Sequence, residues 1–412
     1  MKKNTICLTL VAIATLIYCF GFKPRKNPDR PNASPAEQTP FIINAATAFL
    51  NSLNAAQRDS VVFAFVRQKA ATAARFQLNG NFRGGGGPGA KQGQRPGNDS
   101  THKNGPGGGP PGGGRGGKGG GQFPGVVGEQ YGQAVWSNFP VSFVPRPGLR
   151  LGALNSSQRS AAMHLLKEFL SAQGYEKVTE IMGSDQAQAD AGTDFEAGND
   201  SYRLAIFGTP NSTTPWMVQF GGHHLALNIV IAGAQGALTP ALTGAQPSVY
   251  ELNGKTVRVL DAENDKAFDL LNALSEAQRK KAILNYTVGD LVLGPGHDGE
   301  VIVPEGLKVS EMDAKQKDML VDLIAEWAGI IHNAYAQARM AEIKSGLDDT
   351  YFAWSGPVTH QPGKNGSSYY RIQGPRVIIE FSPQGVGGDL TMHVHTIYRD
   401  PLNNYGNAFY SK

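Results

Sequence analysis

Short strand-like segments, each bounded by glycine, proline or asparagine, place the strongest constraint on the fold of this chain. Four of them, from TYFAWSG at residue 350 to TMHVHTIYR ending at residue 399, follow one another near the C-terminus. Further segments of this kind, YRLAIFG, PWMVQF and HLALNIVIAG, lie between residues 202 and 233. Successive strands joined by short turns pair in antiparallel fashion. These segments therefore predict an antiparallel sheet.

Four helix starts share one local pattern, in which a capping residue is followed three positions later by glutamine. The pairs are Asn54 with Gln57, Asn155 with Gln158, Ser275 with Gln278, and Asp313 with Gln316. This is the capping-box arrangement. The copies are unevenly spaced, which argues against a solenoid but is compatible with an old duplication. The last start opens the longest predicted helix, from Ala314 to about Ile343. Capped helices grouped around an antiparallel sheet predict the α+β class.

Residues 79–125 consist almost wholly of glycine, proline, lysine, arginine, glutamine and asparagine. Such a composition cannot bury apolar surface, so we expect a flexible insert. We therefore predict a single globular domain, 41–412, interrupted by this insert and preceded by a linker over 23–40. The insert is either a spacer or a basic tether to an anionic surface.

The N-terminal residues 1–22 have the form of a secretory signal peptide or N-terminal anchor, because two lysines precede a short apolar run. The only two cysteines, Cys7 and Cys19, lie in this leader. Export to the periplasm, the membrane surface or the medium is expected, without disulfides or thiolate metal sites. This segment would also allow the protein to be attached to the membrane through its N-terminus.

The net charge of +4 does not indicate a nucleic-acid partner. Residues 1–30 and 80–125 each carry a net charge of +5, so the remaining residues together carry −6. A mildly acidic folded body offers no basic face for nucleic acid. The sequence gives no indication of oligomeric state.

Two histidines, His393 and His395, stand one residue apart in a predicted strand. Because side chains alternate along a strand, both rings face the same side and can converge on one ion. If the segment before them closes a hairpin, Glu380 lies opposite His393, although a shift of one residue would turn it to the other face.

A second pair, His223 and His224, follows two glycines and begins an alternating run. The apolar row that includes His223 is expected to face the core, so that His224 and Asn228 face a cleft or solvent. A bulge at the paired glycines would turn both rings to one side. The alternative is that one of these histidines is a hydrogen-bonded core residue.

We therefore predict a metal site made of His223, His224, His393 and His395, with Glu380, Arg399 and Asp400 as catalytic candidates. Three imidazoles with an open position favour Zn²⁺, or Cu²⁺ if they are planar, whereas two with Glu380 suggest Fe²⁺. Arg399 could bind an anionic substrate or form an ion pair with Asp400.

Further side chains complete this inventory. Asn228 and Asp400 are the expected acceptors of the ligands' second N–H groups. His164 and His332 are expected on helices facing solvent, and His297 and His360 lie in turns as weaker ligand candidates.

Several of these motifs together resemble the bacterial family called domain of unknown function 3500. They are WMVQFGGHHLALN, YFAWSG, YYRIQGP, IIEF and HVHTIYRDPLNNYG. The resemblance extends from about residue 41 to the C-terminus without the insert. The positions that it marks are Gly222, His223, His224, Leu225, Glu380, His393, His395, Arg399, Asp400 and Gly406. Asn404 stands where the family pattern leads us to expect an acid.

The resemblance implies no reaction, so the expected function depends on the histidines. The leading hypothesis is an exported metal-dependent enzyme, a hydrolase or an oxidase, acting on a small molecule or polymer that the sequence does not identify. The alternatives are a non-catalytic metal- or ligand-binding surface protein and a structural domain.

Overall fold

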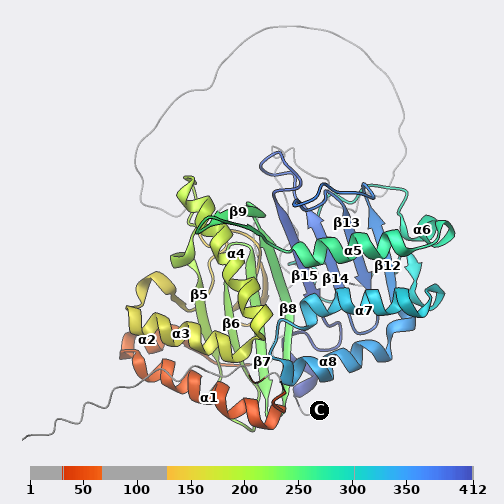
Figure 1. Ribbon diagram of the computed structural model, residues 1–412. Helices are drawn as coiled ribbons and strands as arrows, with labels where there is room; N and C mark the ends of the chain where they lie inside the picture. Colours follow the sequence, from red (N-terminus) through yellow and green to blue (C-terminus); the bar gives the residue numbers. More distant parts are fainter. Residues whose placement is uncertain (1–29, 31, 67–127, 301, 411–412) are drawn as a thin grey trace, which may run out of the picture. The chain divides into compact units, whose positions relative to one another are not determined.

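The computed structural model of the protein describes residues 30, 32–66, 128–300 and 302–410. The leader 1–22 and the glycine-rich insert 79–125 lie outside these residues. Within them, helices pack against one large sheet, and two small antiparallel sheets complete the strand content (Figure 1). The predicted α+β class is therefore confirmed. Among the described residues, no helix combines the length and apolar character of a membrane span.

The helices and strands have the following bounds. The α-helices are α1 Pro35–Ser52, α2 Ala55–Val61, α3 Ser156–Phe169, α4 Ala172–Asp190, α5 Asp261–Ala273, α6 Glu276–Ala282, α7 Ala314–Ala328 and α8 Asn333–Ser345. Short 3-10 helices are η1 Leu151–Ala153, η2 Asn199–Ser201, η3 Val309–Glu311, η4 Leu347–Asp349 and η5 Asn404–Phe409. The strands are β1 Val62–Phe63, β2 Glu129–Tyr131, β3 Ala134–Trp136, β4 Leu149–Arg150, β5 Arg203–Phe207, β6 Trp216–Gly222, β7 Leu225–Ala232, β8 Gln235–Ala245, β9 Val249–Leu252, β10 Lys255–Arg258, β11 Leu307–Lys308, β12 Tyr351–Ser355, β13 Tyr369–Gln373, β14 Ile378–Pro383 and β15 Val394–Arg399.

The large sheet contains 11 strands in the order β1, β5, β6, β7, β8, β15, β14, β13, β12 and β11, with β4 also paired to β5. Its pairings are antiparallel except that between β1 and β5. The antiparallel pattern follows from the short turns between successive strands.

The central strand β8 was not predicted, because its sequence QGALTPALTGA contains glycine and proline, which are disfavoured inside strands. The register of β7 with β8 shifts between Leu227 and Ile229, so that a bulge accommodates Pro240. The side-chain amide of Asn228 donates to the carbonyl oxygen of Pro240 at 2.9 Å. Asn228 is thus buried in the sheet, and its expected position in a cleft was wrong.

All four predicted capping boxes are present, and each begins a helix as expected. A fifth was missed: the backbone N–H of Ser34 donates to the Glu37 carboxylate at 2.8 Å. Helix α1 consequently begins at Pro35, inside the segment expected to be a linker. The boundary at residue 41 was therefore wrong, because a capping residue followed by proline is itself a helix start.

The helix predicted from Ala314 to Ile343 is in fact two helices, α7 and α8. Between them, Ile331 forms a β-bridge with Leu170 at the end of α3. His332 caps the start of α8, where its Nδ1 accepts from the Ala334 N–H at 3.2 Å, and it is buried. Its expected exposure was therefore wrong, whereas His164 on α3 is half-exposed as expected.

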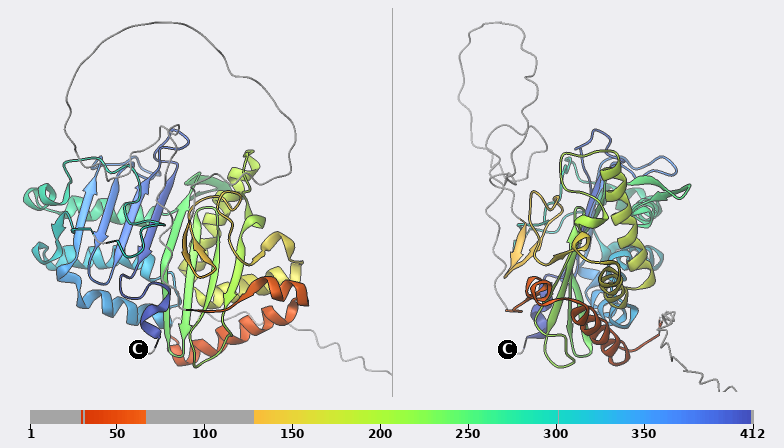
Figure 2. Two further views of the ribbon diagram at one scale, coloured as in Figure 1. Left: turned by 180° about the vertical axis from the view of Figure 1, so that it is seen from behind. Right: turned by 90° about the vertical axis from the view of Figure 1, so that its left-hand side faces the viewer.

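The helices cover one face of the large sheet, and the hairpin β2–β3 with irregular segments covers the other (Figure 2). Alternate residues of β6 divide between these faces, because side chains alternate along a strand. Val218 and Phe220 join the large core under the helices. Met217 instead packs with Tyr131 and Tyr405 on the second face.

The two halves of the described fold repeat the same arrangement. Apart from the hairpin β2–β3, the first half runs α1, α2, β1, then β4, η1, α3, α4, η2 and β5 to β8. After the hairpin β9–β10, the second half runs α5, α6, then β11, η3, α7, α8, η4 and β12 to β15. A backbone hydrogen bond at the start of η1 also has a counterpart at the start of η3. Leu151 N–H donates to Tyr202 O, just before β5, and Val309 N–H donates to Thr350 O, just before β12, both at 2.8 Å. The halves meet where β8 pairs with β15.

Candidate metal centre

His223 and His224 form the two-residue turn between β6 and β7, since Gly222 pairs with Leu225. The expectation that they continue a strand on opposite faces was therefore wrong. His224 has a φ of 60°, and its backbone N–H donates to Asn138 O at 3.1 Å. The turn is also held by Arg146, whose guanidinium donates to Gly222 O at 3.2 Å. The two rings stack, with centroids 3.7 Å apart.

His393 and His395 lie at the start of β15, and their rings are neighbours on one side, as the spacing predicts. Their Nε2 atoms are 3.0 Å apart and their rings are nearly perpendicular. His395 lies opposite Gly244 on β8. A Cβ at Gly244 would lie 3.3 Å from Cδ2 of His395 and 3.4 Å from Cβ of His224, so this glycine leaves space for both rings.

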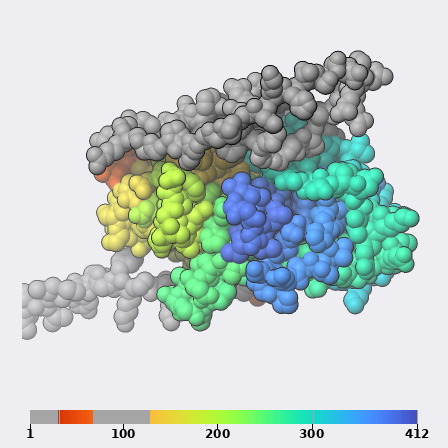
Figure 3. Space-filling model, turned by 90° about the horizontal axis from the view of Figure 1, so that it is seen from above, coloured from red at the N-terminus to blue at the C-terminus, as the bar shows by residue number. Residues whose placement is uncertain are grey.

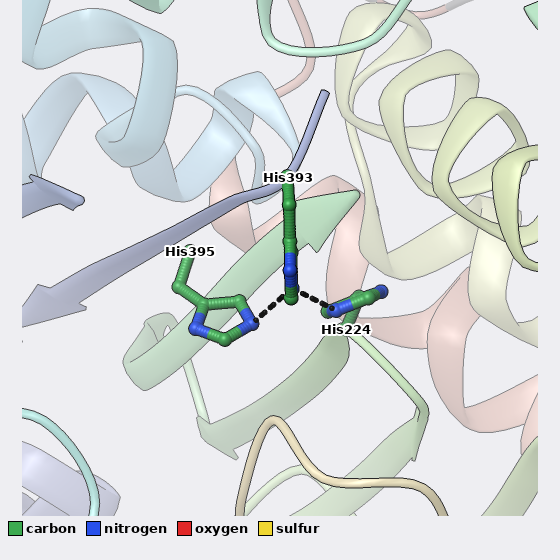
Figure 4. Close-up of side chains that lie close together, drawn as sticks. All are labelled: His224, His393 and His395. Atoms are coloured by element: carbon green, nitrogen blue, oxygen red, sulfur yellow. Dashed lines mark hydrogen bonds between the residues drawn. The ribbon is translucent and has the colours of Figure 1, made fainter. Parts of the chain in front are cut away.

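The three rings of His224, His393 and His395 converge across the boundary between the two halves of the fold. Nε2 of His224 lies 3.0 Å from Nε2 of His393 (Figure 4). Each residue offers a ligand nitrogen, and these nitrogens all lie within 4.8 Å of one another. The predicted convergence of the two histidine pairs is therefore confirmed for these three residues, which form a group that could hold a metal ion.

His223 lies beside this group but is not part of it. Its Nδ1 is 2.9 Å from Oδ1 of Asp185, a fully buried carboxylate on α4. Because a carboxylate accepts hydrogen bonds, Nδ1 carries the proton in this contact. The predicted set of four ligands is therefore reduced to three within the described residues.

The three grouped histidines are buried, with exposed fractions of 1% for His224 and 6% for both His393 and His395. Burial lowers the pKa of His393 to about 4, with a smaller contribution from nearby His223. Burial, reinforced by the neighbouring imidazoles, also places the pKa values of His224 and His395 well below their usual range. At neutral pH these rings are uncharged, which is the state that binds metal.

The second ring nitrogens have different surroundings from those expected. Nδ1 of His393 donates to the carbonyl oxygen of Val386 at 3.0 Å, so Nε2 is left with its lone pair. Nδ2 of Asn138, which is a hydrogen-bond donor, lies 3.2 Å from Nδ1 and 3.4 Å from Nε2 of His395. Nδ1 of His224 is buried and has no hydrogen-bond partner in the described part of the chain.

The Val386 carbonyl belongs to the loop that joins β14 to β15. Seen from above, this loop (dark blue) lies beside α4 (yellow-green) (Figure 3). Its apolar side chains Val386 and Leu390 are 69% and 42% exposed, so they face solvent next to a buried histidine group.

Glu380 occupies a different place from the one expected. It pairs with Ile397 of β15 and not with His393, because the loop between β14 and β15 is longer than a tight hairpin. Its carboxylate accepts from the backbone N–H of Val292 at 2.8 Å and from the Tyr369 hydroxyl at 2.9 Å. Burial raises the pKa of Glu380. It provides no ligand atom to the histidine group.

Arg399 and Asp400 do not pair with each other. Arg399 lies on the histidine face of β15 and donates to buried Glu129 at 3.0 Å and to Asp298 at 2.9 Å. Asp400 instead forms an ion pair with Arg339 of α8 at 2.6 Å. The expected contact of Asp400 with a histidine was therefore wrong, and so was that of Asn228, because both side chains are engaged elsewhere.

The weaker ligand candidates also lie apart from the group. His297 contacts Glu300 at 3.0 Å, and Nε2 of His360 lies 3.5 Å from Asp265. Asp185, Asn138 and Val386 were missed because each comes from a separate helix or loop. No local spacing relates any of them to the histidines.

No curated protein and no solved structure matches this chain. One family model does match, over residues 128–407, and its description is "Protein of unknown function (DUF3500)". The match begins after residues 41–66, which the resemblance had been expected to include. Because it covers more than half of the sequence, the chain belongs to the DUF3500 family.

Proposed function

We propose that the protein binds one divalent transition-metal ion through Nε2 of His224, His393 and His395, and that it is a metal-dependent hydrolase. The observation that carries this proposal is the convergence of three uncharged imidazoles without a fourth ligand among the described residues. Three protein ligands and one open position are typical of catalytic zinc sites, whereas structural sites have four.

The spacing of the nitrogens fits such an ion. Two donors bound to one ion at about 2 Å in tetrahedral geometry lie about 3.3 Å apart. Nε2 of His393 lies 3.0 Å from each partner nitrogen, so these two pairs require only a small outward movement. The ligand nitrogens of His224 and His395 lie within 4.8 Å of each other.

Hydrogen bonds among the three rings satisfy their nitrogens less well than a metal ion would. His393 uses Nδ1 as a donor, so its Nε2 has a single lone pair, yet two other Nε2 atoms lie 3.0 Å from it. One lone pair cannot accept two well-directed bonds. An ion uses the lone pairs of all three rings, which removes this conflict.

The donor set limits the choice of metal. Imidazole suits zinc, copper, iron and nickel, and the chain has no cysteine after Cys19 to select a softer ion. When bound, zinc would supply a water of lowered pKa and would polarise an ester, amide or phosphate oxygen. A redox metal at the same ligands would support an oxidase. The chain's own contribution is to hold three neutral rings in place in a largely dry site.

A non-catalytic metal-binding function is the second candidate. The observation in its favour is the burial of all three rings to 6% exposure or less. A site that is closed to substrate would store or sense an ion without turnover.

Elemental analysis of the full chain, purified without a histidine tag, tests both candidates. The expected result is one zinc ion per chain, together with hydrolysis in a screen of ester, phosphate and peptide substrates that chelation abolishes. One ion without hydrolysis of any of these substrates would support the non-catalytic candidate. Protein that takes up no metal when incubated with Zn²⁺, Cu²⁺ or Fe²⁺ would overturn both.

We also propose that the protein is exported and remains outside the cytoplasm. The charged start, the apolar run in residues 1–22 and the restriction of cysteine to that run support this location. Fractionation of cells that express the full chain tests it. Recovery of the full-length chain in the cytosol would contradict export.

A further inference from the structure

The three grouped histidines differ in how their rings are held. His393 is oriented by Val386 O and His395 is in contact with the Asn138 amide. His224 has no such partner, because its Nδ1 is buried without a hydrogen bond among the described residues. Metal-ligating histidines ordinarily donate their second N–H to a neighbour that fixes the ring. Something else has to orient His224.

Stacking on His223 supplies that constraint. The two rings are 3.7 Å apart between centroids and are inclined by 27°, so they lie almost face to face. The contact restricts rotation of the His224 ring without using either of its nitrogens. Its Nε2 therefore stays directed at His393.

His223 is itself fixed by three separate contacts. Its Nδ1 donates to Asp185 at 2.9 Å, and the Tyr202 hydroxyl donates to its backbone carbonyl at 2.9 Å. The Phe195 ring packs against the His223 ring in a T-shaped arrangement, with centroids 5.1 Å apart. Asp185 in turn accepts from the backbone N–H of Gly198 at 2.9 Å. A rigid connection thus runs from α4 through Asp185 and His223 to His224.

In the second half of the fold, the equivalent turn is joined to its helix without a histidine. There the turn between β13 and β14 is Pro375–Arg376, bounded by Gly374, whose N–H donates to Val377 O at 2.8 Å. At the end of α8, a Cβ at Gly346 would lie 2.9 Å from Pro375, so the helix end and the turn are in close contact. The turn is also tied to this helix by an ion pair, in which Arg376 donates to Glu342 of α8 at 2.7 Å. The equivalent contact therefore forms without an imidazole.

We propose that Asp185 and His223 are positioning residues, which orient the metal ligand His224 through ring stacking and do not bind the ion themselves. This inference rests on the proposed metal site. It explains why a buried pair of a carboxylate and a fourth histidine, Asp185 and His223, lies at the turn that carries the histidine group. The equivalent turn in the second half of the fold has no histidine.

A matched pair of variants in the full chain tests the stacking. Asp185→Asn removes the carboxylate, so that no buried charge is left unpaired when His223 is replaced. On this background, His223→Phe keeps a flat ring against His224, and His223→Ala removes it. The measurements are Co²⁺ and Zn²⁺ affinity by competition with a chelator, and the visible absorption spectrum of the Co²⁺ form.

We expect the phenylalanine variant to bind Co²⁺ within about 3-fold of the Asp185→Asn parent and to keep its spectrum. The alanine variant should bind 10- to 100-fold more weakly, the usual effect of removing a partner of a metal ligand, and its spectrum should change. Urea unfolding of the metal-free proteins separates this effect from a loss of stability. Equal affinities and spectra for the two variants would overturn the positioning role. If the unaltered protein binds neither ion, the proposed function itself has failed.

Discussion

The hydroxyl oxygens of Thr243 and Thr396 lie 2.7 Å apart, in directly opposite positions on β8 and β15. Each comes from a different half of the fold. The indole N–H of Trp327 donates to Thr396 Oγ1 at 2.9 Å, so the pair is tied to α7 as well. The next pair along these strands is Gly244 with His395. The alignment of the two halves therefore fixes His395 relative to the turn that carries His224.

Replacing Thr243 by valine should weaken this boundary. Thr396 would keep the Trp327 bond but would lose its other hydroxyl partner in a buried position. The expected loss is about 1–3 kcal/mol in the free energy of unfolding, measured by urea denaturation. Thr179→Val is the control, because Thr179 bonds only within its own helix at an exposed position, and it should change stability by less than about 0.5 kcal/mol. Equal effects of the two changes would show that the threonine pair does not secure the boundary.

Single alanine replacements of His224, His393 and His395 should each abolish stoichiometric metal. With one of three ligands removed, the ion has only two protein donors and is lost to a moderate chelator. Bound metal per chain after dialysis is the measurement. His164→Ala is the matched control, since this side chain is half-exposed on α3. Retention of one ion per chain by any of the three variants would exclude that residue as a ligand.

The metal-free protein should lose stability as the pH falls from 6.5 toward 4. The pKa of His393 is depressed from 6.5 to about 4, chiefly by burial. The unfolded chain therefore binds more protons than the folded one in this window, and acid favours unfolding. A shift of this size corresponds to at most about 3 kcal/mol. We would measure this loss of stability from urea midpoints of the unaltered protein and of His393→Gln, with a chelator present, across this pH range. A difference between the two proteins that does not change with pH would refute the expectation.

Much of the fold could be predicted because it depends on local patterns. A capping box such as Asn155 with Gln158 is decided within one helical turn, and all four expected copies formed helices. Strand β8 could not be predicted in the same way. Its Pro240 is tolerated only because a bulge opposite Asn228 accommodates it, and that partner lies on another strand.

The candidate site shows the same division between local and long-range information. The shared side of His393 and His395 follows from alternation along one strand. The exclusion of Glu380 depends on the strand register, and that of His223 depends on Asp185, a residue on α4 that lies 38 positions away in the chain. Neither relation leaves a signal in the local sequence. The histidine positions could thus be named, while the division between ligands and their supports could not.

Glu129 should make the stability of the protein depend on pH in the opposite direction to His393. Burial raises the pKa of this carboxyl from 4.5 to about 7, against the lowering effect of Arg399. The folded chain therefore binds more protons than the unfolded one between these values, so this group's stabilising contribution is lost as the pH rises from 4.5 to 7. Over that window, the unaltered protein should lose at most about 3 kcal/mol relative to Glu129→Gln. Glu300→Gln, at a carboxylate that is 42% exposed, is the control and should show no such trend in urea midpoints. A constant difference between the unaltered protein and Glu129→Gln would contradict the raised pKa.

Gly244 provides a test of the site's geometry that leaves every histidine in place. A methyl group there would lie 2.7 Å from Val394 O, which is backbone and cannot move aside, and 3.3 Å from the His395 ring. Gly244→Ala should therefore displace β15 and separate the ligand nitrogens. We expect metal affinity to fall at least 10-fold and stability to fall by about 1–3 kcal/mol, as in other overpacked interiors. Gly385→Ala is the control, because a Cβ at that loop position would meet nothing within 4 Å. Chelator competition and urea unfolding of both variants measure the two effects. Unchanged affinity in Gly244→Ala would mean that the ion, if bound, does not depend on the close approach of β8 to His395.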